Sequence, residues 1–196
     1  MKVVAILLAA GSATRFGSDK LLHALPHDVP IAVQAARHLR AVFERDVFVV
    51  VRPDAKVLPD LLRKEGCEVV VCGRAAEGMG ASLACGVRAA DAAGPADAYL
   101  VALADMPFVR SSTIAAVRDA LSAGAPLVAP YFRARRGHPV GIGAKFRCEL
   151  EALRGDEGAR KIVAANEASL VKVPVGDPGV LRDIDTPQDL VPRAIV

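Results

Sequence analysis

The sequence has 196 residues, a length that fits one domain with a substantial hydrophobic core. Apolar residues make up 53% of it but occur in short runs, and none approaches the ~18 residues that span a bilayer, so we expect no membrane association. The net charge is only +3, and two Tyr, six Phe and no Trp offer little surface for stacking bases. A nucleic-acid partner is therefore not expected, and a small anionic substrate suits the charge better.

The cysteines and the first residues bear on the cellular compartment. A single lysine followed by a strand-like run shows no cleavage-type region, so we expect no secretory signal. The four cysteines form no CxxC pair and have no histidine at zinc-finger spacing: Cys67, Cys72, Cys85 and Cys148. We expect reduced, mostly buried thiols in a cytoplasmic protein, with no disulfide and no metal site among them.

Continuous apolar runs alternate with helical patterns along the chain, which is typical of parallel strands joined by crossover helices. Strands are expected at 3–9, 47–51, 67–72, 97–103, 126–132 and 169–174, and 138–143 extends the sheet. Helices are expected at 31–42, 53–66, 81–93, 113–123 (with Ser111 or Ser112 as cap), 145–153, after 155, and near Pro187. We predict a single three-layer α/β/α domain over residues 1–196, with a mostly parallel, Rossmann-like sheet.

The loop after the first strand, GSATRFGSDK, lies where such sheets bind ligands, at the carboxyl end of a strand. Its small residues let backbone N–H groups approach phosphate oxygens. It is not a P-loop, because Gly11 and Gly17 are too far apart and no Lys-Ser or Lys-Thr follows directly. It is not a dinucleotide fingerprint either, because Ser12 and Ala13 follow Gly11 where a second glycine is needed.

Two cations remain in this loop, and they suit a phosphorylated ligand. Arg15 can grip phosphate oxygens with its forked guanidinium, and Lys20 can reach a transferring group as a point charge. The alternative is a loop with solvated charges.

The complete pattern, LAAGSATRFGSDK, resembles the signature of the MobA-like nucleotidyltransferases, which share a nucleotide-diphospho-sugar-transferase-like fold. The resemblance continues in EGMGASLACGV, LADMP, GHPVGI, GDEGAR and DIDTPQDL. It implies transfer of a nucleotide from an NTP to a phosphorylated acceptor with release of pyrophosphate. The residues of the first motif, Ala9, Ala10, Gly11, Ser12, Arg15 and Lys20, would then bind the nucleotide, with Arg15 on the β/γ phosphates and Lys20 at the α-phosphoryl group.

Two acidic motifs are candidates for a metal site. Asp105 follows a buried strand and can bind a hard cation or cap a turn; the resemblance implies that it binds Mg²⁺ and makes it catalytic with Arg15 and Lys20. Asp183 and Asp185 lie on one side of an extended segment, with Ile184 opposite. Either can complete a magnesium site, and the alternative for this motif is helix capping around Thr186 and Asp189.

Two further motifs are open to more than one interpretation. In EGMGASLACGV, Gly80 and Ser82 belong to an ordinary helix-entry loop or contact the nucleotide, as the resemblance implies. In RARRGHPVGI, a solvated charge run, an acceptor-phosphate site and a general-base histidine compete. The resemblance favours acceptor binding by Gly137 and His138, and the roles of Arg133, Arg135 and Arg136 stay open. Arg160 and Lys161 of GDEGARK are expected to face water.

The resemblance also indicates the substrates. Ala10 stands where guanylyltransferase relatives tend to have a second glycine, which favours CTP over GTP, and molybdenum-loaded molybdopterin becomes the expected acceptor. A recipient molybdoenzyme would then be a partner of the protein. The segment DVPIAVQ departs from the usual glycine-proline-leucine sequence, which weakens the assignment of the acceptor. The alternatives are another NTP or small phosphorylated acceptor, and a non-catalytic nucleotide- or cofactor-binding chaperone for a molybdoenzyme.

Overall fold

A computed structural model describes residues 1–11, 20–25, 28–156 and 158–190. Within these ranges one large sheet has the strand order β10-β7-β9-β6-β1-β4-β5, with β8 paired to β7. The strands of this sheet are β1 (Val3–Ala9), β4 (Val47–Val51), β5 (Glu68–Val71), β6 (Ala98–Leu103), β7 (Leu127–Phe132), β8 (Arg135–Arg136), β9 (Val140–Gly143) and β10 (Leu170–Pro174). A small antiparallel pair, β2 (Ala24–Leu25) and β3 (Val29–Pro30), lies apart from it.

The sheet is mostly parallel. β1 pairs in parallel with β4 and with β6, β4 with β5, and β7 with β10. β9 runs antiparallel to both β6 and β7, and β8 is antiparallel to β7. The carboxyl ends of β5, β4, β1 and β6 therefore lie side by side at one edge of the sheet.

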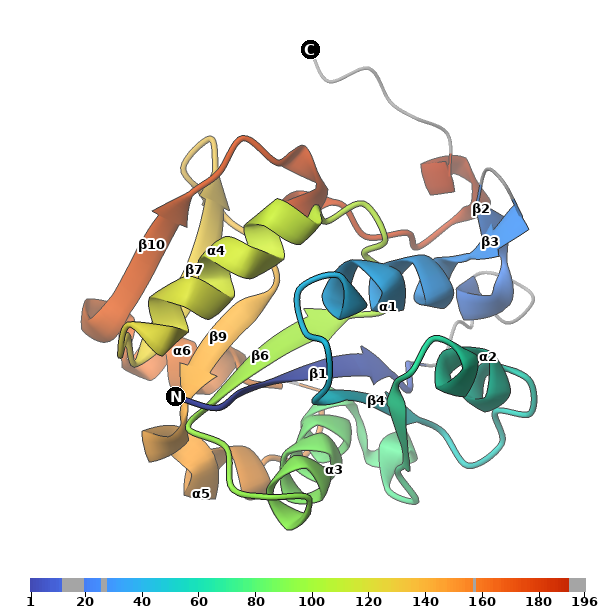
Figure 1. Ribbon diagram of the computed structural model, residues 1–196, viewed down its shortest axis with the longest axis horizontal. Coiled ribbons are helices and arrows are strands. Elements are labelled where there is room, and N and C mark those ends of the chain that lie inside the picture. Colours follow the sequence, from blue (N-terminus) through green and yellow to red (C-terminus); the bar gives the residue numbers. More distant parts are fainter. Residues whose placement is uncertain (12–19, 26–27, 157, 191–196) are drawn as a thin grey trace.

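Helices cover both faces of the sheet, as Figure 1 shows. Strand alternation places Leu7 of β1 in one core cluster and Ile6 in the other, so each face of the central strand is buried under a helical layer. One layer holds α1 (Ile31–Arg40), α2 (Leu58–Lys64) and α4 (Ser111–Ser122), and the other holds α3 (Met79–Ala92), α5 (Arg147–Glu151) and α6 (Arg160–Ala165). The predicted three-layer α/β/α fold is confirmed.

The remaining elements are short 3₁₀ helices. They span Lys20–Leu22, Ala75–Glu77, Ala144–Phe146, Glu167–Ser169, Pro178–Leu181 and Pro187–Leu190. None of the helices within the described ranges is both long and apolar enough to cross a membrane.

Two helix starts differ from the sequence-based expectation. The second helix begins at Leu58 rather than near Pro53, because residues after β4 form a turn in which the Ala55 amide donates to the Arg52 carbonyl at 3.2 Å. α4 begins at Ser111 without a serine side-chain cap. The carboxylate of Asp177, distant in the sequence, accepts from the Arg110 amide at 2.9 Å in that place.

The expectation that no disulfide forms is wrong for one pair of cysteines. Cys72 and Cys85 are joined by a disulfide, with their Cα atoms 5.9 Å apart, whereas buried Cys67 and exposed Cys148 are free. Cys72 follows β5 and Cys85 lies on α3, and α3 packs back against β4 and β5. The chain reversal between them is a tertiary feature that cysteine spacing does not reveal.

Candidate active site

A cleft of about 860 Å³ opens at the carboxyl edge of β1, β4, β5 and β6, where ligands bind in open α/β sheets. Its lining combines small residues with four carboxylates and two cations. These are Leu8, Ala10, Gly11, Lys20, Leu21, Arg52, Pro53, Asp54, Gly73, Ala75, Ala76, Gly78, Met79, Ser82, Leu103, Asp105, Asp156 and Asp185. The cleft thus brings together residues from both ends of the sequence.

Lys20 lies between two carboxylates of this cleft. Its Nζ atom is 3.0 Å from Asp105 Oδ2 and 3.2 Å from Asp185 Oδ1, and its side chain is only 11% exposed. Burial lowers the pKa of Lys20, but the charges and hydrogen bonds of Asp105 and Asp185 outweigh burial and raise it overall. The ammonium group therefore stays charged at neutral pH and is held at a fixed point in the cleft.

Asp105 and Asp185 are brought together by the backbone. Asp105 follows β6 in a turn where the Met106 amide donates to the Leu103 carbonyl, and the Asp105 carbonyl accepts from the Ile184 amide at 2.9 Å. Ile184 is fully buried in the core, so its neighbours Asp183 and Asp185 point outward, as strand alternation predicts.

The two terminal aspartates differ in position. Asp185 lines the cleft and contacts Lys20. Burial and the negative charges of Asp185 and Asp105 raise the pKa of Asp183. Asp183 is therefore close enough to the other two carboxylates to interact with them electrostatically. Asp189 has the capping role considered for this motif, because its Oδ2 accepts from the amide and the hydroxyl of Thr186 at 2.9 and 2.8 Å. The motif therefore supplies both a turn cap and a cleft carboxylate.

The first motif is described only in part. Ala10 and Gly11 line the cleft beside Lys20, and Ala9 is the last residue of β1. Ser12 and Arg15 lie outside the described residues, so their predicted contacts with the nucleotide stay predictions.

The glycine-bearing entry to α3 is held by packing. Ser82 is buried, lines the cleft and donates from its hydroxyl to the Gly78 carbonyl at 3.3 Å. The Gly80 amide donates to the Gly155 carbonyl at 2.7 Å, and a Cβ on Gly80 would lie 2.7 Å from the Arg154 carbonyl oxygen. Gly80 is therefore committed to the neighbouring segment, and its contact with a nucleotide, like that of Ser82, stays a prediction.

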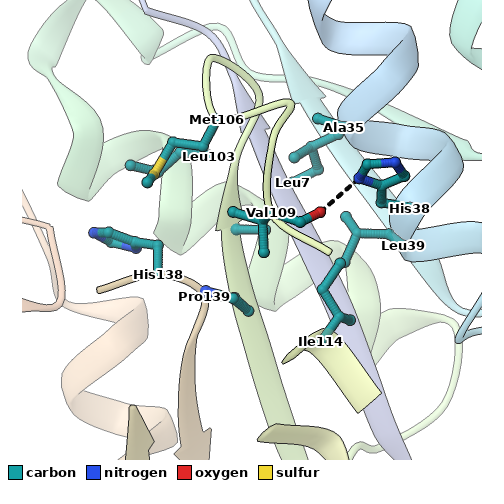
Figure 2. Close-up of a pocket in the computed structure, with 11 residues that line it drawn as sticks. Leu7, Ala35, His38, Leu39, Leu103, Met106, Val109, Ile114, His138 and Pro139 are labelled. Atoms are coloured by element: carbon teal, nitrogen blue, oxygen red, sulfur yellow. Dashed lines mark hydrogen bonds between the residues drawn. The ribbon is translucent and has the colours of Figure 1, made fainter. Parts of the chain in front are cut away.

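His138 lies just before β9 and is not among the described residues that line the cleft. It lines a small pocket of about 10 Å³ together with Leu103 and Met106, and Figure 2 shows it across that pocket from His38. The Nδ1 atom of His138 is buried and has no hydrogen-bond partner among the described residues. Burial lowers the pKa of His138, with the charge of Arg136 acting in the same direction and that of Asp105 against it. The imidazole is therefore neutral at neutral pH, and its buried Nδ1 lies in a pocket that shares Leu103 with the cleft.

Gly137, the other predicted residue of this motif, and His38 both have structural contacts that explain their positions. A Cβ on Gly137 would lie 2.4 Å from the Val180 carbonyl oxygen, so only glycine fits there. His38 Nδ1 lies 2.5 Å from the Val109 carbonyl oxygen, so this histidine ties α1 to the segment before α4. The acceptor-binding roles of Gly137 and His138 stay predictions.

Arg52, Asp54 and Asp156 line the cleft but were not singled out from the sequence. The first two come directly after β4, and the rule that placed a ligand site after β1 applies equally to its parallel neighbour. Asp156 reaches the cleft because the turn at Gly155 packs against the entry to α3. That contact depends on tertiary structure and has no local signal.

The carboxylates of the cleft suit a magnesium ion. No group of three or more His, Cys, Asp or Glu side chains arranged for a metal occurs in the described part of the chain. Asp105 and Asp185 nevertheless converge on one cation, the Lys20 ammonium. Mg²⁺ keeps several waters and commonly takes one or two protein carboxylates together with substrate phosphates, so this pair fits it.

Comparison with known proteins identifies the family. The model of the MobA-like NTP transferase domain matches residues 5–170. The chain belongs to the MobA-like NTP transferase family. It is therefore a nucleotidyltransferase of the MobA-like kind, as the motifs indicated.

Relatives and solved structures agree with this membership. The chain is similar to Purine catabolism protein PucB of Bacillus subtilis, with 29% identity covering 98% of this chain and 97% of that protein. The fold is shared with Rv0371c from Mycobacterium tuberculosis, at a TM-score of 0.76, 23% identity and 96% coverage of both chains. A manganese complex of Rv0371c aligns at a TM-score of 0.74, with 22% identity and 96% coverage of both chains. Molybdopterin-guanine dinucleotide biosynthesis protein A from Archaeoglobus fulgidus aligns at 0.65, with 21% identity over 97% of this chain and 95% of that one.

Proposed function

We propose that this protein transfers CMP from CTP to molybdenum-loaded molybdopterin, releasing pyrophosphate, in the cytoplasm. The observation that carries the proposal is Lys20, fixed within 3.2 Å of both Asp105 and Asp185 in a cleft large enough for a nucleotide. A cation and two carboxylates at one point suit phosphoryl chemistry, in which charge must be neutralised and two anions brought together. Ala10 in the cleft wall supports CTP over the larger guanine nucleotide, as the resemblance implies.

The reaction needs no general base, because a phosphate monoester is already ionised at neutral pH. Its oxygen would attack the α-phosphorus in line, forming the new P–O bond as the bond to pyrophosphate breaks. In this proposal, Lys20 stabilises the charge at the α-phosphoryl group and Arg15 holds the β/γ phosphates. Asp105 and Asp185 would hold Mg²⁺, which when bound neutralises phosphate charge. Gly137 and His138 would orient the acceptor from the side of β9.

The proposal is tested by pyrophosphate release with Mg²⁺ and each of CTP, GTP, ATP and UTP, with and without molybdenum-loaded molybdopterin. We expect release with CTP that depends on the acceptor and is lost in Asp105→Ala. Asp119→Ala, in an exposed aspartate paired with Arg118, is the control for removing a carboxylate. Release with another NTP or another phosphorylated acceptor would overturn the substrate assignment. Tight nucleotide binding without turnover for any acceptor would instead favour a binding protein that serves a molybdoenzyme.

A further inference from the structure

Arg52 and Asp54 form an ion pair in the cleft on the side of β4. Both follow β4 and line the cleft, and Arg52 Nε lies 3.3 Å from Asp54 Oδ1. The strand order β6-β1-β4-β5 puts β1 between this pair and Asp105, which follows β6. The cleft therefore has one cluster of charged side chains at β1 and β6 and a separate ion pair at β4, and Asp156 adds a carboxylate beside the entry to α3.

The surroundings of the two charged groups differ. Near β4 and β5 the cleft is lined by small residues, Gly73, Ala75 and Ala76, with Leu8 and Ala10 from β1. Such a surface leaves room for a flat ring and gives it apolar contact. If a nucleotide binds with its phosphates at Lys20, its base lies on the β4 side of the cleft.

We propose that Arg52 and Asp54 recognise the base of the nucleotide and select cytosine, an inference that rests on the proposed function. Along its hydrogen-bonding edge, cytosine presents an amino donor at N4 followed by acceptors at N3 and O2. The guanidinium of Arg52 donates to N3 and O2, and the carboxylate of Asp54 accepts from the N4 amino group. The ion pair holds the two side chains next to each other, so that both can reach the hydrogen-bonding edge of one cytosine ring.

The same pair discriminates against uracil. Uracil has a carbonyl acceptor at position 4, where cytosine has its amino donor, and a carboxylate facing that carbonyl has no proton to share. Sites built to hydrogen-bond a particular group reject analogues that leave the site's polar groups unpaired. Replacing Asp54 by asparagine supplies an amide N–H₂ that can donate to the uracil carbonyl, and it leaves the N3–H of uracil facing the donors of Arg52.

The test compares Asp54→Asn and Arg52→Ala with the wild type. Affinities for CTP, UTP and GTP are measured by titration calorimetry, and pyrophosphate release is measured with each nucleotide. The matched control is Asp60→Asn in the exposed Arg63–Asp60 pair of α2, joined at 2.7 Å outside the cleft. We expect Asp54→Asn to shift the CTP:UTP affinity ratio toward UTP by at least about 10-fold, and Arg52→Ala to weaken CTP binding about 10-fold. Asp60→Asn should change neither.

Three results would overturn the inference, and a fourth separates it from the proposed function. Unchanged nucleotide ratios in both variants would show that the pair does not contact the base. Equal weakening of all nucleotides would assign the pair to the ribose or phosphates. If the wild type prefers GTP, the proposed use of CTP fails and so does cytosine selection by this pair, whereas a CTP preference with an unexpected acceptor leaves the base-reading inference intact.

Discussion

The backbone amide of Ile184 donates a hydrogen bond to the carbonyl oxygen of Asp105 at 2.9 Å. This bond joins the segment after β6 to the segment near the carboxyl terminus, so that Asp185 and Asp105 both reach the ammonium group of Lys20. The geometry of the cleft therefore depends on how firmly the carboxyl-terminal segment is held to the sheet. Several contacts hold it, and they can be tested separately.

Lys20→Ala should lower kcat for pyrophosphate release about 100-fold, because the variant lacks the cation expected to stabilise the transferring group. Binding of nucleotide should change less than kcat, since Asp105 and Asp185 stay in place to bind a metal. Steady-state kinetics with calorimetric nucleotide titration would measure both. Lys64→Ala, on the last turn of α2, is the control. A variant with normal kcat would exclude Lys20 from the chemistry.

Asp177→Ala should destabilise the protein by about 2–3 kcal/mol, because a nearly buried carboxylate with charge-assisted hydrogen bonds is removed. Its Oδ2 accepts from the Arg110 amide at 2.9 Å and the Thr113 hydroxyl at 2.7 Å, and its Oδ1 accepts from the Gly179 amide at 3.0 Å. Urea unfolding would measure the loss. The expectation would be contradicted if this variant unfolded at the same urea concentration as the wild type.

Gly179→Ala should destabilise the carboxyl-terminal segment strongly, and Gly176→Ala should not. A Cβ on Gly179 would lie 2.1 Å from the Phe108 carbonyl oxygen, whereas a Cβ on Gly176 would meet nothing within 4 Å. Overpacking of this kind costs about 1–3 kcal/mol or more because backbone must move. Thermal unfolding of the two variants would compare them directly, and equal stabilities would mean that the Gly179–Phe108 contact is not close in solution.

Ionisation of Tyr99 should reduce stability at alkaline pH. Burial and the hydrogen bond to Asp91 raise the pKa of Tyr99 to about 12, with Arg147 opposing. A tyrosine in the unfolded chain releases its proton near pH 10. The stability that protonated Tyr99 contributes to the folded state is therefore fully present below pH 10 and declines as pH rises toward 12.

Ionisation of Tyr99 should lower the free energy of unfolding by about 1 kcal/mol between pH 9 and pH 11. Urea unfolding at the two pH values would measure it, and Tyr99→Phe should remove this part of the pH dependence. Tyr131→Phe, at the partly exposed end of β7, is the control. The same pH dependence in Tyr99→Phe and wild type would attribute the loss to other groups.

The sequence predicted the architecture well because the relevant signals are local. The run Val3–Ala9 forms β1 as expected and is buried along its whole length, and the alternating helices establish the parallel sheet. The carboxyl-end rule then located the cleft, and the motifs indicated that Lys20, Asp105 and Asp185 belong to it. These inferences needed no knowledge of how the chain returns on itself.

Other features depend on tertiary contacts and could not be predicted in this way. The Cys72–Cys85 disulfide forms because α3 packs back on β5, and Asp177 reaches the start of α4 from another part of the chain. The family resemblance implied that Gly80 contacts the nucleotide, with an ordinary helix-entry loop as the alternative. In the structure, the absence of a side chain on Gly80 makes room for the Arg154–Gly155 backbone. The spacing of glycines in a sequence does not distinguish a glycine needed for such packing from one needed for ligand contact.

The reversed direction of β9 has a consequence for how such a protein can change over evolution. Because β9 enters the sheet beside the carboxyl end of β6, with Val140 paired to Val101, the β7–β8 hairpin that precedes it lies at the same end of the strands as the cleft. Only its turn, Arg133 and Ala134, is exposed and outside the paired strands, so a change of length there leaves Gly137 on Val180 and the segments of Lys20 and Arg52 in place. An insertion at this turn is therefore the change of chain length that the cleft would tolerate best.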